Sequence, residues 1–302
     1  MKALVILGPT AVGKTAIAEI AAQKLDGEII SADSRQVYRG MSIGTAKPIS
    51  QNVLYHLLDI IEPAERYDAA RFVEDAAKAI NNISSRNRVP IIVGGTGLYI
   101  RSLTAGLFPG NFRDSKISEE LKIRRNNGED LYQLLLSIDP VAAQKIDPHN
   151  HIRIERALEV YYISGNPISF WWETATRPPT DIDFIKIGLN IDRKILCERI
   201  EARIQAMLQA GWIDEVKALL DNSIPSDAPG FSSIGYRSVV AHIQGKLDFD
   251  EMIVQITKET KHYAKRQMTW FRREPNVMWL DVTNMQMDKI VQKIEAIWKN
   301  EC

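Results

Sequence analysis

The chain has 302 residues, of which 45% are hydrophobic and 25% charged, and its formal net charge is zero. This composition is typical of a globular protein with one large or two linked domains, and it excludes attraction to nucleic acid through overall charge. No apolar stretch approaches membrane-spanning length, and the first strand begins at Lys2, which leaves no room for a targeting segment. Cys197 and Cys302 have neither metal-site nor disulfide spacing. We therefore expect a cytoplasmic monomer with no membrane association, in which any nucleic-acid binding depends on local patches.

An apolar run at 2–7 is followed at once by an octet that fits the phosphate-binding pattern G-x-x-x-x-G-K-[ST]. The octet consists of Gly8, Pro9, Thr10, Ala11, Val12, Gly13, Lys14 and Thr15. Its glycines let backbone N–H groups turn toward phosphate oxygens, Lys14 adds a charge, and the Thr15 hydroxyl can reach a phosphate oxygen or Mg²⁺. The helix expected at 16–25 offers its positive N-terminus. A chance glycine-rich turn is the weaker interpretation, so the sequence predicts a diphosphate or triphosphate site.

The strand–loop–helix pattern is repeated twice in the next residues. Strands are expected at 28–32 and 89–93, and helices at 69–85 and 98–103. Three such units predict an α/β fold with a parallel sheet and helices on both faces, in which ligands bind outside the carboxyl ends of the strands. That rule brings the octet, Asp33 and residues 94–96 to one crevice. A P-loop nucleotide hydrolase usually has an apolar strand that ends in a metal-holding aspartate, whereas the strand at 89–93 is followed by glycines. Asp33 is the one residue that could replace that aspartate, so the residues needed for nucleotide hydrolysis look incomplete.

Residues 113–183 differ from the preceding stretch, because they lack strong strand signals. Helices are predicted at 117–126, 130–137 and 148–164, the last with Pro148 near its start and Gly165 at its stop. Arg153 and Arg156 share one face of that helix. We expect a catalytic core from residues 1–112 and 184–302, and a helical insertion between them.

The C-terminal part contributes a long helix after Asp192, a helix break at Gly211 with a packed Trp212, and a helix from about residue 248. The end of that last helix is basic and aromatic, with Lys258, Lys261, His262, Lys265, Arg266, Gln267, Trp270, Phe271, Arg272 and Arg273. Such charge usually marks a solvated helix face. Interleaved aromatic residues and few acids favour an RNA or phosphate contact instead. The sequence leaves both interpretations open.

Taken together, these stretches resemble the tRNA dimethylallyltransferase (isopentenyltransferase) family. The matching segments run in family order at 8–15, 33–40, 44–48, 94–99, Arg153, 156–160, 211–212, 234–237 and 265–271. The resemblance implies a P-loop NTPase-like core whose helical insertion grips the anticodon stem-loop of tRNA. It also implies transfer of a dimethylallyl group from dimethylallyl diphosphate to the exocyclic N6 amine of the adenosine 3′-adjacent to the anticodon. Ser118, Asn150 and Ile152 depart from the family pattern, so the grip of the insertion is less well supported than the chemistry.

The chemistry of this transfer assigns roles to the residues at the crevice. Asp33 is expected to be the general base, while Lys14, Thr15, Arg237 and Mg²⁺ stabilise the departing diphosphate, with Thr15 as the metal ligand. The adenosine must be flipped out of its stack to reach them. Contacts to tRNA are expected from Asp33, Ser34, Arg35, Gln36, Thr96, Arg153, Arg156, Lys265, Arg266 and Gln267.

Alternatives remain open for single residues and for the whole chain. Asp33 could instead hold a metal ion or cap a helix, and Thr96 could merely close a strand–helix turn. The nearest rival function is an adenylate isopentenyltransferase acting on free AMP, ADP or ATP. A small-molecule kinase and a non-catalytic RNA-binding protein are further rivals. The insertion and the basic segment favour tRNA, because a free nucleotide needs neither.

Overall fold

The computed structural model describes residues 1–106, 112–174 and 181–300. The chain forms two compact units, of which the first comprises Met1–Thr104 and Pro178–Cys302 and the second Ala105–Arg177. The expected insertion, residues 113–183, begins and ends later than this second unit. The expected boundaries were placed where strand signals stop and where they resume in the sequence. The boundaries of the second unit are instead set by which residues contact one another in the structure.

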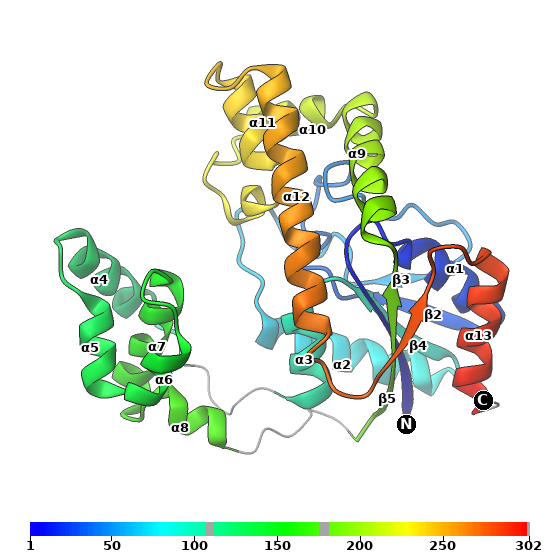
Figure 1. The fold of residues 1–302 in the computed structure, drawn as a ribbon, viewed down its shortest axis with the longest axis horizontal. Coiled ribbons are helices and arrows are strands. Elements are labelled where there is room, and N and C mark those ends of the chain that lie inside the picture. Colours follow the sequence, from blue (N-terminus) through cyan, green and yellow to red (C-terminus); the bar gives the residue numbers. More distant parts are fainter. Residues whose placement is uncertain (107–111, 175–180, 301–302) are drawn as a thin grey trace. The chain divides into compact units, whose positions relative to one another are not determined.

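The first unit is built on one parallel sheet of six described strands in the order β3-β2-β4-β1-β5-β6 (Figure 1). The strands are β1 Lys2–Leu7, β2 Gly27–Ser31, β3 Tyr55–His56, β4 Val89–Gly94, β5 Asp183–Asn190 and β6 Val277–Asp281. In the central strand β1, residues 3–7 have no exposed surface. Leu7 pairs with Gly94 on one side and with Gly188 on the other, so β1 and β4 end level with one another and β5 continues for two more residues. The phosphate octet, Asp33 and Gly95 therefore leave the sheet at the same edge.

Helices cover both faces of this sheet and extend beyond the carboxyl ends of its strands (Figure 1). They are α1 Lys14–Lys24, α2 Ala69–Ser85, α3 Gly97–Ala105, α9 Arg193–Gln209, α10 Trp212–Asp221, α11 Tyr236–Ile243, α12 Phe249–Phe271 and α13 Met287–Lys299, with a 3-10 turn at Pro229–Ser232. α1 packs on α13, whereas α12 packs on α9 and α11 above the strand ends. The predicted α/β fold, a parallel sheet flanked by helices, is confirmed.

Side-chain caps set where the helices of this unit begin. The carboxylate of Asp68 accepts the N–H groups of Ala70 and Arg71, which starts α2 at the predicted residue. Asp192 caps α9 in the same way, as its sequence position predicts. At α12, Asp248 and Glu251 form a reciprocal capping box. These local signals lie within a few residues of each helix start, which is why the sequence located the helices well.

The second unit consists of helices in the residues that the structure describes. They are α4 Ser115–Asn126, α5 Leu131–Ile138, α6 Pro140–Lys145, α7 His151–Ser164 and α8 Ile168–Glu173. Their apolar sides share a core that includes Leu121, Leu135, Ile154 and Leu158. The prediction that α7 begins at Pro148 is wrong, because the side chain of Asn150 caps the helix by accepting the N–H of Arg153. Between residues 1 and 300, outside 107–111 and 175–180, no helix is long and apolar enough to cross a membrane.

Candidate active site

The phosphate octet adopts the conformation that its glycines permit. A side chain at Gly8 would place its Cβ 2.9 Å from the carbonyl oxygen of Leu189, and Gly13 has a φ of 104°. Gly13 is the N-cap of α1 and offers no side-chain cap, so the first N–H groups of α1 remain free to bind an anion. The Lys14 Nζ donates to the carbonyl oxygen of Pro9 at 2.7 Å, which holds the ammonium group inside the loop.

Two cavities meet at this loop. The small cavity, about 70 Å³, is polar and is lined by Lys14, Thr15, Ser31 and Gln36 among others. The large cavity, about 470 Å³, extends away from the loop between the strand ends and helices α9 and α12. Of the described residues, those that line both cavities are Thr10, Asp33, Gly95, Arg203, Tyr263 and Gln267. A molecule with a diphosphate in the small cavity would therefore have its remaining atoms in the large one.

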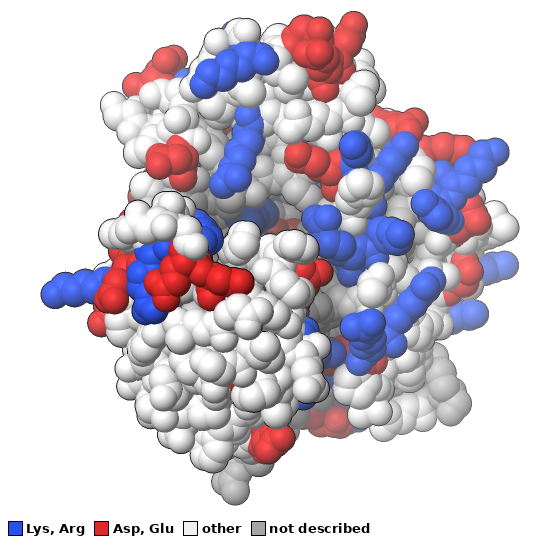
Figure 2. Space-filling model, turned by 60° about the vertical axis from the view of Figure 1, so that its left-hand side comes forward, with Lys and Arg blue, Asp and Glu red and all other residues white. Residues whose placement is uncertain are grey.

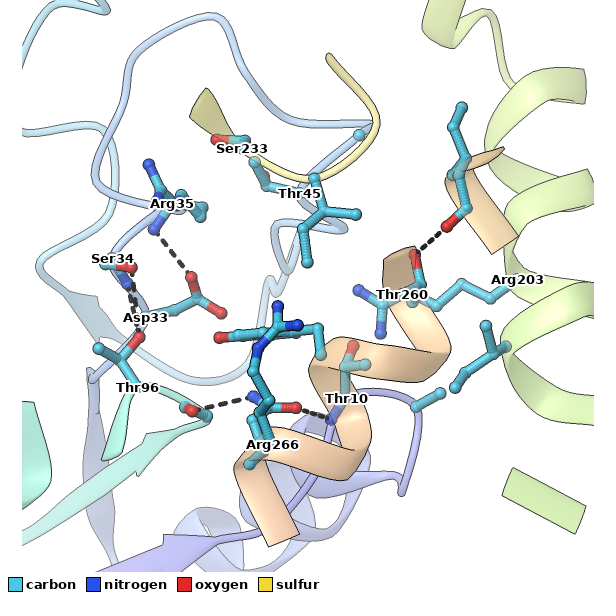
Figure 3. A pocket seen from close by; sticks show the side chains of 18 of the residues that line it. Thr10, Asp33, Ser34, Arg35, Thr45, Thr96, Arg203, Ser233, Thr260 and Arg266 are labelled. Atoms are coloured by element: carbon cyan, nitrogen blue, oxygen red, sulfur yellow. Dashed lines mark hydrogen bonds between the residues drawn. The ribbon is translucent and has the colours of Figure 1, made fainter. Parts of the chain in front are cut away.

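Asp33 lies at the junction of the cavities, where two half-buried cations, Lys14 and Arg203, also line the walls. In Figure 3 Asp33 and Thr96 approach from the strand ends, while Arg203 approaches from α9 on the opposite side. The Asp33 Oδ1 accepts the N–H of Arg35 at 2.8 Å, which fixes the carboxylate at the start of its loop. Burial lowers the pKa of Lys14 to about 7, an effect that Asp33 opposes and Arg203 increases. Burial also lowers the pKa of Arg203, again opposed by Asp33.

Arg203 was missed by the sequence analysis, and Arg237 was chosen in its place. Arg237 is exposed and lines neither cavity, because Tyr236, Val239 and Val240 are the residues that α11 buries. Arg203 lies within a stripe of α9 at helical spacing with Ile200, Ile204 and Met207, all of which line the large cavity. An arginine in the middle of an apolar helix face is the signal in the sequence that could have identified Arg203 as a site residue.

The expected RNA-contacting residues after β2 differ in their surroundings. The N–H of Ser34 donates to Thr96 Oγ1 at 3.0 Å, so Thr96 does close the junction between two strand ends. The Arg35 guanidinium donates to Ser232 Oγ at 2.7 Å, and all three residues, Ser34, Arg35 and Thr96, line the large cavity. Gln36 lines only the small cavity, where its amide accepts from Ser31 and points its NH₂ toward the carbonyls of Thr45 and Ala46.

Lys265, Arg266 and Gln267, the three residues near the end of α12 that were expected to contact tRNA, have different surroundings. Lys265 is exposed and lines neither cavity. Arg266 lines the large cavity, with its guanidinium 5.8 Å from the centre of the Tyr263 ring. Gln267 is buried and joins two loops, since its Oε1 accepts the Thr10 N–H at 2.8 Å and its Nε2 donates to the Gly95 oxygen at 2.9 Å. The Gln267 side chain therefore holds the phosphate loop in place.

In the second unit, the two predicted arginines of α7 also differ. Arg153 is exposed at the first turn of the helix. Arg156 pairs with the buried carboxylate of Glu159 at 2.6 Å and also donates to the carbonyl oxygen of Phe112. Ser118 donates to the other oxygen of Glu159 at 2.7 Å. Arg156 and Ser118 therefore serve the interior of this unit, and Arg153 is the one of the pair that is open to a partner.

Two family models match the chain. The one described as IPP transferase matches residues 36–274, and the one described as isopentenyl transferase matches residues 1–56. The chain belongs to the IPP transferase family. The longer match covers the loop after β2, the second unit and helices α9 to α12, and the shorter one covers the phosphate octet. Both cavities described above therefore lie within matched sequence.

Relatives in the IPP transferase family are similar over nearly the whole chain. The tRNA dimethylallyltransferase of Carboxydothermus hydrogenoformans is 42% identical, over 97% of this chain and 96% of that protein. That of Thermotoga maritima is 39% identical, over 98% of each. Among solved structures, the full-length tRNA isopentenylpyrophosphate transferase of Bacillus halodurans is 37% identical with a TM-score of 0.74, covering 99% and 96% of the two chains. A eukaryotic dimethylallyltransferase acting on tRNA has a TM-score of 0.83 at 26% identity, covering 99% of this chain and 79% of that one.

Proposed function

We propose that this protein transfers a dimethylallyl group from dimethylallyl diphosphate to the N6 amine of the adenosine 3′-adjacent to the anticodon in tRNA. The observation that carries this proposal is the junction of a small polar cavity with a large one at Asp33 and Arg203. The large cavity lies within the size range of small-molecule sites, about 300–1,000 Å³. The relatives named above act on tRNA according to their names, which favours tRNA over free AMP as the acceptor.

The donor fits the cavities by the polarity of their walls. Its diphosphate would lie in the small cavity, where Lys14, Thr15 and the N-terminus of α1 are available to its oxygens. Its hydrocarbon end would extend into the large cavity against Ile200 and Ile204 of α9 and the other apolar residues of that wall, Met207 and Ile256. Such a wall also keeps water away from the reactive carbon, which limits hydrolysis of the donor.

The transfer breaks the bond between the donor's first carbon and its diphosphate oxygen, which keeps the electron pair. The adenine amine forms the new carbon–nitrogen bond and loses a proton, for which Asp33 is the one carboxylate among the described residues that line the two cavities. The amine is a weak nucleophile because its lone pair is delocalised into the ring, so a positioned base lowers the barrier. Lys14, which lines the small cavity, and Arg203, which lines both cavities, would stabilise the negative charge that develops on the diphosphate.

The small cavity has the oxygen groups that a magnesium ion needs. Mg²⁺ is commonly held by one or two protein oxygens together with substrate phosphate oxygens, and the Thr15 hydroxyl lines the small cavity near Asp33. Among the described residues there is no group of three or more histidine, cysteine or acidic side chains that would form a dedicated metal cage. When bound to the diphosphate, the ion would neutralise part of its charge.

For the acceptor, the proposal assigns the anticodon stem-loop to the expected insertion, residues 113–183, most of which belongs to the second unit. Arg153 at the start of α7 is exposed and suited to a phosphate contact. Figure 2 shows several lysine and arginine side chains close together on one face, so the zero net charge of the chain conceals local positive patches. The adenosine would be flipped into the large cavity, where Ser34, Arg35 and Arg266 offer polar groups to its edges. We further propose that the protein works as a cytoplasmic monomer.

The decisive experiment offers the protein radiolabelled dimethylallyl diphosphate together with either unmodified tRNA or AMP, followed by nucleoside analysis. The proposal expects label in one modified adenosine of the tRNA and none in AMP. A tRNA whose adenosine beside the anticodon is replaced by guanosine serves as the matched control and should stay unlabelled. Label on AMP alone, or ATP-dependent phosphorylation of a small acceptor without prenyl transfer, would contradict the proposal.

A further inference from the structure

Glu215 of α10 is a carboxylate with no assigned role that accepts four hydrogen bonds. Three come from consecutive backbone N–H groups, with Ser42 at 2.7 Å and Ile43 at 2.6 Å on Oε2 and Gly44 at 3.2 Å on Oε1. The fourth comes from the Tyr236 hydroxyl of α11, at 2.7 Å on Oε1. One side chain thus joins two helices to a loop that lies far away in the sequence.

The loop that Glu215 holds, residues 41–46, is a turn with its own hydrogen bonds, from the Ala46 N–H to the Ile43 oxygen and from Thr45 Oγ1 to the Met41 oxygen. Neither of these bonds ties the turn to α10, which Glu215 does. Its N–H groups at 42–44 converge on one carboxylate, as the backbone of an anion-binding nest does. Gly44 lies so close to α10 that a Cβ there would be 2.0 Å from Trp212 Nε1 and 2.6 Å from the Tyr236 ring. Pairing of these part-buried N–H groups with Glu215 stabilises this position, because a donor that loses its partner away from water is costly.

This loop lines the large cavity through Gly44 and Thr45, and only its last residue, Ala46, lines the small one. The three N–H groups that Glu215 accepts, at residues 42–44, all belong to residues that do not line the small cavity. Gly44 and Thr45 line the large cavity together with Trp212 of α10 and Ser233 of the following loop, and Figure 3 shows Thr45 and Ser233 on the same side. Ser42, Ile43 and Tyr236, the other partners of Glu215, do not line the small cavity. Glu215 therefore supports one end of the site, the end away from the phosphate loop.

We propose that Glu215 is a positioning residue that holds the wall of the large cavity against which the acceptor adenosine is bound, an inference that rests on the proposed function. It acts through the loop 41–46 and does not touch the reacting atoms. Loss of its carboxylate releases that wall while leaving the phosphate loop intact. The consequence is a selective loss of acceptor binding, which a general loss of folding would not produce.

The test compares Glu215→Gln with Asp214→Asn, the neighbouring change on α10. Asp214 has a side chain that is 82% exposed and forms an ion pair with Lys217, so the control removes the same charge without touching the loop. Hydrogen exchange should be about tenfold faster across residues 41–46 in Glu215→Gln, the equivalent of one lost hydrogen bond, and unchanged in Asp214→Asn. Glu215→Asp, which keeps the charge on a shorter side chain, should lie between them.

Binding and kinetics complete the test with inorganic pyrophosphate and unmodified tRNA. In Glu215→Gln the KM for tRNA should rise about tenfold while the Kd for pyrophosphate stays within about twofold. Unchanged exchange and tRNA kinetics, or an equal loss of pyrophosphate and tRNA binding, would overturn the inference. Absence of transfer by the unaltered chain would refute the proposed function alone, and the exchange and pyrophosphate measurements would still decide whether Glu215 anchors this wall.

Discussion

Binding of the donor's diphosphate should weaken as the pH rises above 7, because Lys14 loses its proton in the empty site. Burial and Arg203 lower the pKa of Lys14 to about 7 from the usual 10.5, although Asp33 opposes the shift. Only the charged form attracts the diphosphate strongly. From the fraction protonated, the Kd for pyrophosphate should rise about fivefold between pH 7 and 8 and about tenfold between pH 8 and 9.

Isothermal titration calorimetry with pyrophosphate, in buffers of different ionisation enthalpy, measures both the Kd and the protons taken up. At pH 8 the wild type should take up close to one proton. Lys14→Arg keeps its charge throughout this range, so its profile reports only the ionisation of pyrophosphate itself. If the Kd of wild type and of Lys14→Arg changed in parallel with pH, with no proton uptake in either, Lys14 would not titrate near pH 7.

Two substitutions should shift the pH dependence of the Kd for pyrophosphate in opposite directions. Asp33→Asn removes the charge that keeps Lys14 protonated, so the weakening should begin at lower pH. Arg203→Ala removes a charge that repels Lys14 and should move the weakening to higher pH, although overall affinity for pyrophosphate falls because a cation is lost.

The free energy of unfolding of the unliganded wild type should also rise between about pH 7 and 10.5, because there the unfolded chain binds more protons at Lys14 than the folded one. Lys14→Met should abolish that rise.

Three further predictions test other parts of the structure. Asp33→Asn should lower kcat by about 10²–10⁴-fold with little change in tRNA affinity, whereas partial rescue by excess Mg²⁺ and a raised donor KM would instead identify Asp33 as a metal ligand. Lys265→Ala should reduce the slope of log affinity against log salt for tRNA by about one if it contacts a phosphate, and an unchanged slope would make it a solvated residue. Glu28→Gln should lower the free energy of unfolding by about 3 kcal/mol in urea denaturation, since the fully buried carboxylate pairs with Arg86 and Arg88; a loss under 1 kcal/mol would contradict this.

The elements that the sequence predicted well depend on signals within a few residues. The phosphate octet, the cap at Asp68 and the capping box at Asp248 each lie beside the structure they determine. The strands β3 and β6 were missed. β3 has only two residues, and β6 is recognisable mainly by its pairing with β5. Such pairing depends on long-range contacts, which periodicity in the sequence does not report.

The site residues divide in the same way. Asp33 follows its strand directly, so its position at the crevice was predictable from the rule for parallel sheets. Gln267 was assigned to RNA, yet its amide binds Thr10 and Gly95, which are 257 and 172 positions away in the sequence. Arg203 and Arg237 differ only in which side of their helices is buried. That choice depends on how α9 and α11 pack, and the sequence pattern alone favoured Arg237, which lines neither cavity.

The central strand β1 leaves the ribosome first but is completed late. On one side it pairs with β4, yet on the other Lys2 pairs with Asp183, beyond the whole second unit. At about 5–20 residues per second, synthesis of that unit takes roughly 4–15 seconds, during which one apolar edge of β1 is exposed. The second unit has its own core and can fold during this interval. Mutations that slow its folding should therefore cause aggregation of nascent chains through the open edge of β1, even where they leave the finished enzyme unaffected.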